Sequence, residues 1–312
     1  MCEVFAVILI LFGMIPIISS FSNLKRKVLS VNRKWTMNIH SRTSLLNIYD
    51  SYGVSVYSPE LAREYNIQYL NRGDIEADTG LILTKNEHYL ELLWGKGSNK
   101  KEKPFRIDFT SSALQDRSHS YRNELVYKAF KSVTAQNNAA IIDMTAGLGR
   151  DSYILASAGL RVLMLERNPV LYLLLQDALK QVQDQAIANN LALVYCDSTD
   201  ASIGNIITDS LSRWHGNLPM DLSVYLDPMY QNTSIGKRSL VKKETQMLHR
   251  LVPAEVNEEN NLRLFRQATH VATNKIVVKR PKNADYIYAE AHDCIVGSTH
   301  RFDVYYKHRL QS

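Results

Sequence analysis

The chain has 312 residues, of which 45% are apolar and 22% charged, values typical of a globular protein with one large or two modest domains. Its three cysteines, Cys2, Cys196 and Cys294, lie far apart, which excludes a disulfide framework and a zinc site of ordinary spacing; we therefore expect a cytoplasmic protein without a structural metal. The net charge of +6 comes mostly from residues 23–42, which hold six basic and no acidic residues. Global charge is therefore no evidence for a nucleic-acid partner.

The N-terminal segment, residues 1–42, has the composition of an extension rather than of a folded domain. Residues 4–22 are uncharged and mostly apolar, and the basic segment follows them. This pattern fits a short membrane anchor, a cleaved signal, or a reading frame whose true start is Met37. We favour the start at Met37, followed by the anchor, and expect a membrane contact only if residues 4–22 are an anchor.

The folded part of the chain divides into a small α+β lobe, residues 43–115, and a larger region, residues 116–312. In the lobe, apolar runs separated by polar turns predict strands, two of which form a hairpin. A polar helical stretch then leads into the larger region. These elements are expected at 45–50 for the first strand, 80–94 for the hairpin, 105–109 for the last strand and 121–133 for the helix.

From Ala139 onward, apolar strands alternate with helices, a pattern that predicts βαβ units and a mostly parallel sheet buried on both faces. Gly159 is placed to end one helix, and Asn168-Pro169 is a typical start for the next. The last two strands are joined by a short connection and are expected to be antiparallel. The strands are predicted at 139–144, 160–166, 191–197, 223–227, 274–280, 293–299 and 301–307.

Polar residues stand at the ends of four successive predicted strands. Asp143 leads into a turn through Gly147 and Gly149, and Glu166 ends the next strand. Asp197-Ser198 and Asp227 end the two strands that follow. Ligands of open α/β sheets bind beyond the carboxyl ends of the strands, where an acid after the second strand accepts the hydroxyls of a ribose. The set therefore predicts a nucleoside site.

The glycine turn helps to choose the cofactor. A dinucleotide fingerprint is G-x-G-x-x-G, whereas this turn reads Gly147-x-Gly149-Arg150-Asp151-Ser152. The acidic Asp151 would repel a pyrophosphate and suits a cationic ligand such as S-adenosylmethionine (SAM). The chain has no phosphate-binding G-x-x-x-x-G-K-[ST] loop, which argues against ATP. An NAD-dependent oxidoreductase stays open as the less favoured alternative.

The sequence Asp227-Pro228-Met229-Tyr230 follows a buried strand and is suited to methylation of an amine. The carboxylate of Asp227 and the carbonyl of Pro228 can accept hydrogen bonds from a nucleobase amino group, and Tyr230 can stack on the base. We expect these three residues to be catalytic. A turn that merely ends a strand, with Tyr230 as a core aromatic, explains this tetrapeptide alone equally well.

Two basic clusters flank the proposed site. Their positions after strand ends suit phosphates of a polynucleotide, although a solvated helix face explains any single charge run. The residues expected to bind RNA are Lys237, Arg238, Lys242, Lys243, Lys279 and Arg280.

Six blocks in this order resemble the bacterial ribosomal RNA small subunit methyltransferase J family. They are DMTAGLGRDSYILASAG, MLERNPV, YLDPMY, KRSLVKKE, VVKRP and HRFDVY. The resemblance runs from about Leu45 to about Tyr306 and has no counterpart for residues 1–36. The chain departs from the family at Asp197, where small residues are usual, and at 111–124, where the family is rich in glycine.

The resemblance implies a class I methyltransferase fold with a seven-stranded sheet, SAM as cofactor, and methylation of N2 of a guanine in 16S ribosomal RNA. The partner would be ribosomal RNA or the small ribosomal subunit, with no DNA expected. A methyltransferase acting on amines of DNA or protein is the alternative. The implied cofactor contacts are Arg150-Asp151, Glu166-Arg167, Asp197-Ser198 and Asp227. We also expect contacts from Asp143, Gly147 and Gly149, because they stand at the end of the first strand of the sheet and in the turn that follows it.

Overall fold

The computed structural model describes residues 46–50, 67–69, 81–85, 89–94, 104–133, 139–215, 221–229 and 258–310, the first three ranges by their backbone alone. The chain from Ser44 to Ser312 forms one compact unit. Within the described ranges, no helix is long and apolar enough to cross a membrane. Residues 4–22, for which an anchor is the second of three interpretations, lie outside them.

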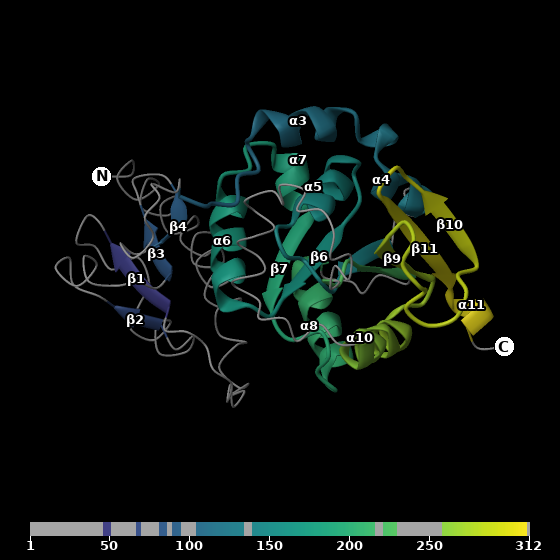
Figure 1. Cartoon of the computed structure of the whole chain (residues 1–312). Coiled ribbons are helices and arrows are strands. Elements are labelled where there is room, and N and C mark those ends of the chain that lie inside the picture. The colour runs from purple at the N-terminus through teal and green to yellow at the C-terminus, as the bar shows by residue number, and fades with distance from the viewer. Residues whose placement is uncertain are drawn as a thin grey trace, which may run out of the picture. The chain divides into compact units, whose positions relative to one another are not determined.

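A seven-stranded sheet forms the centre of the larger region (Figure 1). Its strand order is β10-β11-β9-β8-β5-β6-β7. The five strands β5 to β9 are parallel to one another, and β11 runs antiparallel to its neighbours β9 and β10. The predicted α/β fold with an antiparallel last strand is confirmed. The strands are β5 (Ala139–Asp143), β6 (Val162–Glu166), β7 (Leu191–Tyr195), β8 (Asp221–Leu226), β9 (Lys275–Pro281), β10 (Asp293–Val296) and β11 (His300–Tyr306).

Helices cover both faces of this sheet, so alternate residues of each central strand enter two separate cores. Ile141 joins the core under α5 and α6, whereas its neighbour Ile142 joins the core under α8 and α10. Such continuous apolar strands are typical of parallel sheets buried on both sides. The helices are α3 (Ser112–His119), η3 (Tyr121–Asn123), α4 (Leu125–Phe130), α5 (Arg150–Ser157), α6 (Pro169–Lys180), α7 (Gln185–Asn189), α8 (Ile203–His215), α10 (Glu258–Val271) and α11 (Lys307–Leu310).

Two predicted helix boundaries are confirmed. The side chain of Asn168 accepts hydrogen bonds from the backbone N–H groups of Val170 and Leu171, at 3.0 and 3.1 Å, so it caps α6 with Pro169 in the first turn. Gly159 follows α5 with a φ of +82°, the left-handed conformation that favours glycine and ends a helix.

A second sheet, with strand order β2-β1-β3-β4, precedes the larger one in the chain. The predicted hairpin is confirmed, because β3 and β4 pair antiparallel from Leu81↔Trp94 to Lys85↔Leu90. The backbone N–H of Leu90 donates to the Asp177 carboxylate of α6 at 2.8 Å. The strands are β1 (Leu46–Asp50), β2 (Ile67–Tyr69), β3 (Leu81–Lys85) and β4 (Leu90–Trp94).

Two predicted elements are corrected. The expected strand at 105–109 is reduced to one bridge between Leu92 and Phe105, because the Asp108 side chain accepts from the N–H and hydroxyl of Thr110 and turns the chain. The expected helix at 121–133 is broken into η3 and the six-residue α4, and the longer α3 precedes both.

Candidate functional site

A cavity of about 920 Å³ opens at the carboxyl ends of the parallel strands. The chain reverses its direction of winding between β5 and β8, which are adjacent in the sheet but lead to helices on opposite sides. Ligands of open α/β sheets bind at such a switch point. The volume lies in the range of sites for cofactors and other small molecules.

Gly147 and Gly149 form the turn between β5 and α5, with φ of +52° and +67°. A Cβ on Gly149 would lie 2.7 Å from Cδ2 of Leu175 and 3.0 Å from Cζ of Phe109. Only a residue without a side chain fits against these buried groups. The turn is therefore pressed onto the core, and its backbone forms part of the cavity wall.

Two buried acids beside this turn are held by neutral donors. Glu166 accepts from the backbone N–H of Gly147 at 2.9 Å and from that of Asn168 at 2.7 Å. Asp143 accepts from the Ser152 hydroxyl at 2.5 Å and from the backbone N–H of Thr145 at 3.0 Å. Burial raises the pKa of both carboxyl groups to about 7, against the lowering effect of these donors.

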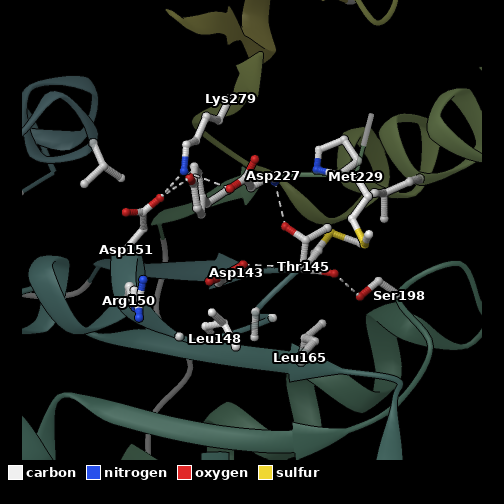
Figure 2. Close-up of a pocket in the computed structure, with 18 of the residues that line it drawn as sticks. Asp143, Thr145, Leu148, Arg150, Asp151, Leu165, Ser198, Asp227, Met229 and Lys279 are labelled. Atoms are coloured by element: carbon white, nitrogen blue, oxygen red, sulfur yellow. Dashed lines mark hydrogen bonds and ion pairs between the residues drawn. The ribbon is translucent and has the colours of Figure 1, made fainter. Parts of the chain in front are cut away.

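A second group of acids is held by charged side chains (Figure 2). The ammonium of Lys279 lies 2.8 Å from Asp151 Oδ2 and 2.8 Å from Asp227 Oδ2. Asp151 also accepts from the Tyr225 hydroxyl at 2.7 Å and contacts Arg117 at 3.5 Å.

These contacts act differently on the two carboxyl groups. Burial works to raise the pKa of Asp151, but the charge and hydrogen bond of Lys279, with the donors Tyr225 and Arg117, lower it overall. For Asp227, burial raises the pKa, and Lys279 offsets only part of that rise. Asp227 thus combines a partly neutralised charge with a side chain that is 38% exposed to the cavity.

Two residues that sequence reasoning did not single out organise this end of the cavity. The Thr145 hydroxyl accepts from the backbone N–H of Asp227 at 2.6 Å and joins the ends of β5 and β8. The Tyr225 ring packs near Phe130 and Phe302 in the core, while its oxygen reaches Asp151. Tyr225 stands two residues before Asp227 on the same strand face, a spacing that could have indicated its place.

Comparisons with known proteins define the family. The family model described as "Putative SAM-dependent methyltransferase" matches residues 61–307. Proteins named ribosomal RNA small subunit methyltransferase J include one from Serratia proteamaculans, 36% identical over 74% of this chain and 88% of its own length. One from Buchnera aphidicola is 32% identical over 74% of this chain and 89% of its own length. The chain belongs to the ribosomal RNA small subunit methyltransferase J family.

The fold of this family member agrees with that assignment. The crystal structure of a SAM-dependent methyltransferase from Neisseria gonorrhoeae superposes with a TM-score of 0.59, covering 84% of this chain and 96% of that chain at 24% identity. The class I methyltransferase fold expected from the resemblance of the six blocks is therefore confirmed.

The cavity at the carboxyl ends of the parallel strands brings the predicted cofactor residues together. All of them line it: Asp143, Gly147, Gly149, Arg150, Asp151, Glu166, Arg167, Asp197, Ser198 and Asp227. Pro228, Lys279 and Arg280 line it too. Tyr230, Lys237, Arg238, Lys242 and Lys243 lie outside the described residues. The individual roles assigned to these residues stay predictions.

The side chains of the cavity suit SAM, the cofactor of this family. Glu166 offers carboxylate oxygens at the end of β6, where a ribose is bound in such folds. Leu148 and Leu165 line the cavity and would supply apolar surface for an adenine ring. Several carboxylates compensate the positive sulfonium and ammonium groups. The glycine turn keeps the backbone close to the ligand, as a small-molecule cradle requires.

Proposed function

We propose that this protein transfers a methyl group from SAM to the exocyclic N2 amine of a guanine in small-subunit (16S) ribosomal RNA. Membership of the J family supports the RNA substrate, because the curated relatives are named for it. The observation that carries the chemistry is the position of Asp227. Its carboxylate stands at the switch point of the sheet, in the same cavity as the acids expected to hold the cofactor.

The cofactor half of the reaction rests on Glu166, Asp197-Ser198 and the glycine turn. When bound, SAM supplies an electrophilic methyl group on a sulfonium. Glu166 is held in place by two backbone donors and would accept the ribose hydroxyls. Ser198 is fixed by its hydrogen bond to the Met144 carbonyl at 2.6 Å, and Asp197 by the Thr199 N–H at 2.8 Å. Such held side chains orient a ligand without further ordering cost.

The acceptor half rests on Asp227, Pro228 and Tyr230. The amine of guanine is conjugated with the ring and is a weak nucleophile. Asp227 and the Pro228 carbonyl would accept its N–H groups and hold the nitrogen in line with the methyl group, while Tyr230 stacks on the base. Positioning of this kind supplies most of the rate in reactions that need little general-base strength.

The RNA backbone would be held by basic residues around the cavity. Lys237, Arg238, Lys242 and Lys243 are proposed for this role from the sequence, and Arg280 lines the cavity itself. Neutralised phosphates make binding strongly salt-dependent. A ribosomal substrate also places the activity in the cytoplasm.

The test is methyl transfer from labelled SAM to four substrates: small ribosomal subunits, naked 16S RNA, DNA and protein extract. We expect label in the ribosomal RNA, released on digestion as N2-methylguanosine. RNA from a strain lacking the gene should lose one such nucleotide, and the wild-type gene should restore it. Label only in DNA or protein, or N2-methylguanosine unchanged in the deletion strain, would overturn the proposal. Protection from melting by NAD but not by S-adenosylhomocysteine would point to an oxidoreductase instead.

A further inference from the structure

Lys279 has an unusual environment for a residue predicted to bind RNA phosphates. It lies at the carboxyl end of β9, and its ammonium sits between Asp151 of α5 and Asp227 of β8 (Figure 2). The sheet register puts it there, since Leu226 pairs with Val278 and the next residues of the two strands are Asp227 and Lys279. Its side chain is 22% exposed. An ammonium so engaged is a poor partner for a phosphate.

The carboxylates around Lys279 would repel one another without it. Asp151 and Asp227 line one end of the cavity, and the charge of Asp151 raises the pKa of Asp227. Both charges also raise the pKa of Asp143, beside the glycine turn. Lys279 is the basic side chain that contacts both Asp151 and Asp227. Removing it would leave Asp227 with burial and a neighbouring negative charge, both of which raise the pKa of its carboxyl group, against the weaker lowering effect of His300.

The two carboxylates share Lys279 but differ in their remaining contacts. Asp151 is engaged at both oxygens, with Arg117 at Oδ1 and with Lys279 and Tyr225 at Oδ2. Asp227 uses Oδ2 for Lys279, and its Oδ1 makes no hydrogen bond to any residue that the structure describes. A carboxylate tied at one oxygen keeps a fixed orientation and leaves the other oxygen to a ligand.

We propose that Lys279 is a positioning residue for methyl transfer, which holds Asp227 ionised with Oδ1 directed at the acceptor amine. The inference rests on the proposed function and adds a role that neither cofactor nor RNA binding requires. Lys279 does not touch the reacting atoms; it acts through Asp227. Loss of the lysine should therefore slow the chemical step more than it weakens the affinity for RNA or cofactor.

The experiment compares Lys279→Met, Lys279→Arg and wild type in methyl transfer to small-subunit RNA. Lys180→Met is the matched control, because Lys180 is exposed at the far end of α6 and does not line the cavity. Titration with S-adenosylhomocysteine gives the cofactor affinity and the folded fraction by which rates are normalised. The readouts are kcat, KM for RNA, and the pH at which kcat falls on the acid side.

For Lys279→Met we expect kcat to fall on the order of 10²-fold, the cost of a misplaced group in a reaction that depends on positioning. The acid-side fall in kcat should move up by about one pH unit or more, as expected for a carboxylate that loses a close positive charge. Lys279→Arg keeps the charge, so its acid-side fall should stay at the wild-type pH while kcat recovers in part. Lys180→Met should match wild type.

Three outcomes would overturn the proposal. A raised KM for RNA with unchanged kcat would make Lys279 a phosphate contact, and a loss confined to cofactor affinity would make it a cofactor contact. An unchanged pH profile in Lys279→Met would exclude control of Asp227. If Lys279→Met does not fold, Lys279→Arg decides, and a shift in the pH of its acid-side fall in kcat would refute the proposal.

A wild-type protein that is inactive on ribosomal RNA but active on another amine would refute the proposed function alone. The same variants would then be compared on that substrate.

Discussion

The two ends of the cavity hold their acids by different means. Beside the glycine turn, Asp143 and Glu166 are fixed by hydroxyl and backbone N–H donors, and the pKa of each is raised to about 7. At the ends of β8 and β9, Lys279 contacts both Asp227 and Asp151 of α5; the pKa of Asp151 is lowered, and the rise that burial causes in the pKa of Asp227 is partly offset. Neutral donors fix geometry but leave protonation adjustable near neutral pH, whereas a cation fixes geometry and also favours the ionised form.

This contrast matches the division of labour in the proposed reaction. A ribose can be bound by an acid that adjusts its protonation as the ligand arrives. An acceptor amine needs an oxygen whose charge and direction are already set, because reorganisation at that step would slow the reaction. Three substitutions would break or sharpen the comparison.

The largest effect is expected at Asp227. Asp227→Ala removes the acceptor at the reacting end and should lower kcat on the order of 10²- to 10³-fold, the range for loss of one preorganised polar group. Label transferred from SAM to small-subunit RNA measures it. The control is Asp209→Ala, an exposed acid in the middle of α8. Wild-type turnover in Asp227→Ala would disprove the assignment of the acceptor end.

A smaller effect is expected at Glu166. If a bound ribose donates to its ionised form, binding must release a proton at acidic pH, so the affinity for S-adenosylhomocysteine should rise with pH up to about 7 and then level off. Glu166→Gln should bind about tenfold more weakly at pH 8, since a hydrogen bond to a charged acceptor is lost. Its affinity should vary less with pH in this range, with Asp143 as the other carboxyl group of the cavity whose pKa is raised to about 7. Calorimetric titration at several pH values tests both points, and a pH dependence as strong in Glu166→Gln as in wild type would count against this residue.

The smallest effect concerns folding rather than turnover. The pKa of Asp143 is raised from its ordinary value of 3.8 to about 7 in the folded chain, so between these pH values the folded state holds a proton that the unfolded state has lost. This adds stability at low pH that is lost as pH rises through about 7, at about 1.4 kcal/mol per pH unit where only the folded state is protonated. Denaturant unfolding without cofactor should show a slope for wild type that is smaller in Asp143→Asn, in which Glu166, with a pKa also raised to about 7, keeps its own share. Equal slopes between pH 5 and 7 would contradict the prediction.

Much of this arrangement could be predicted from the sequence because parallel strands deliver their ends to one edge. Alternation of apolar strands with helices predicted the sheet, and Asp143, Glu166 and Asp227 followed as strand-end acids on one side of it. The start of α6 at Asn168 and the end of α5 at Gly159 could be predicted by local rules, because both depend only on neighbouring residues. The broken helix at 121–133 and the single bridge at Phe105 were missed, since they depend on side-chain contacts that periodicity does not report.

The contacts of Lys279 show what the sequence could not provide. Read alone, VVKRP is a basic segment after a strand, which suits a phosphate. Its pairing with Asp151 and Asp227 depends on the register of β8 and β9 and on the position of the first turn of α5. These residues lie 128 and 52 positions away along the chain. No local pattern carries that information.

The contact of Gly149 with Leu175 has a consequence for variation within the hydrophobic interior. Leu175 does not line the cavity, yet one of its methyl groups would be 2.7 Å from any side chain at position 149. A bulkier residue at 175 would push the glycine turn into the cavity. A substitution in the interior, at a position that does not line the cavity, would then change the shape of the cavity and with it the activity.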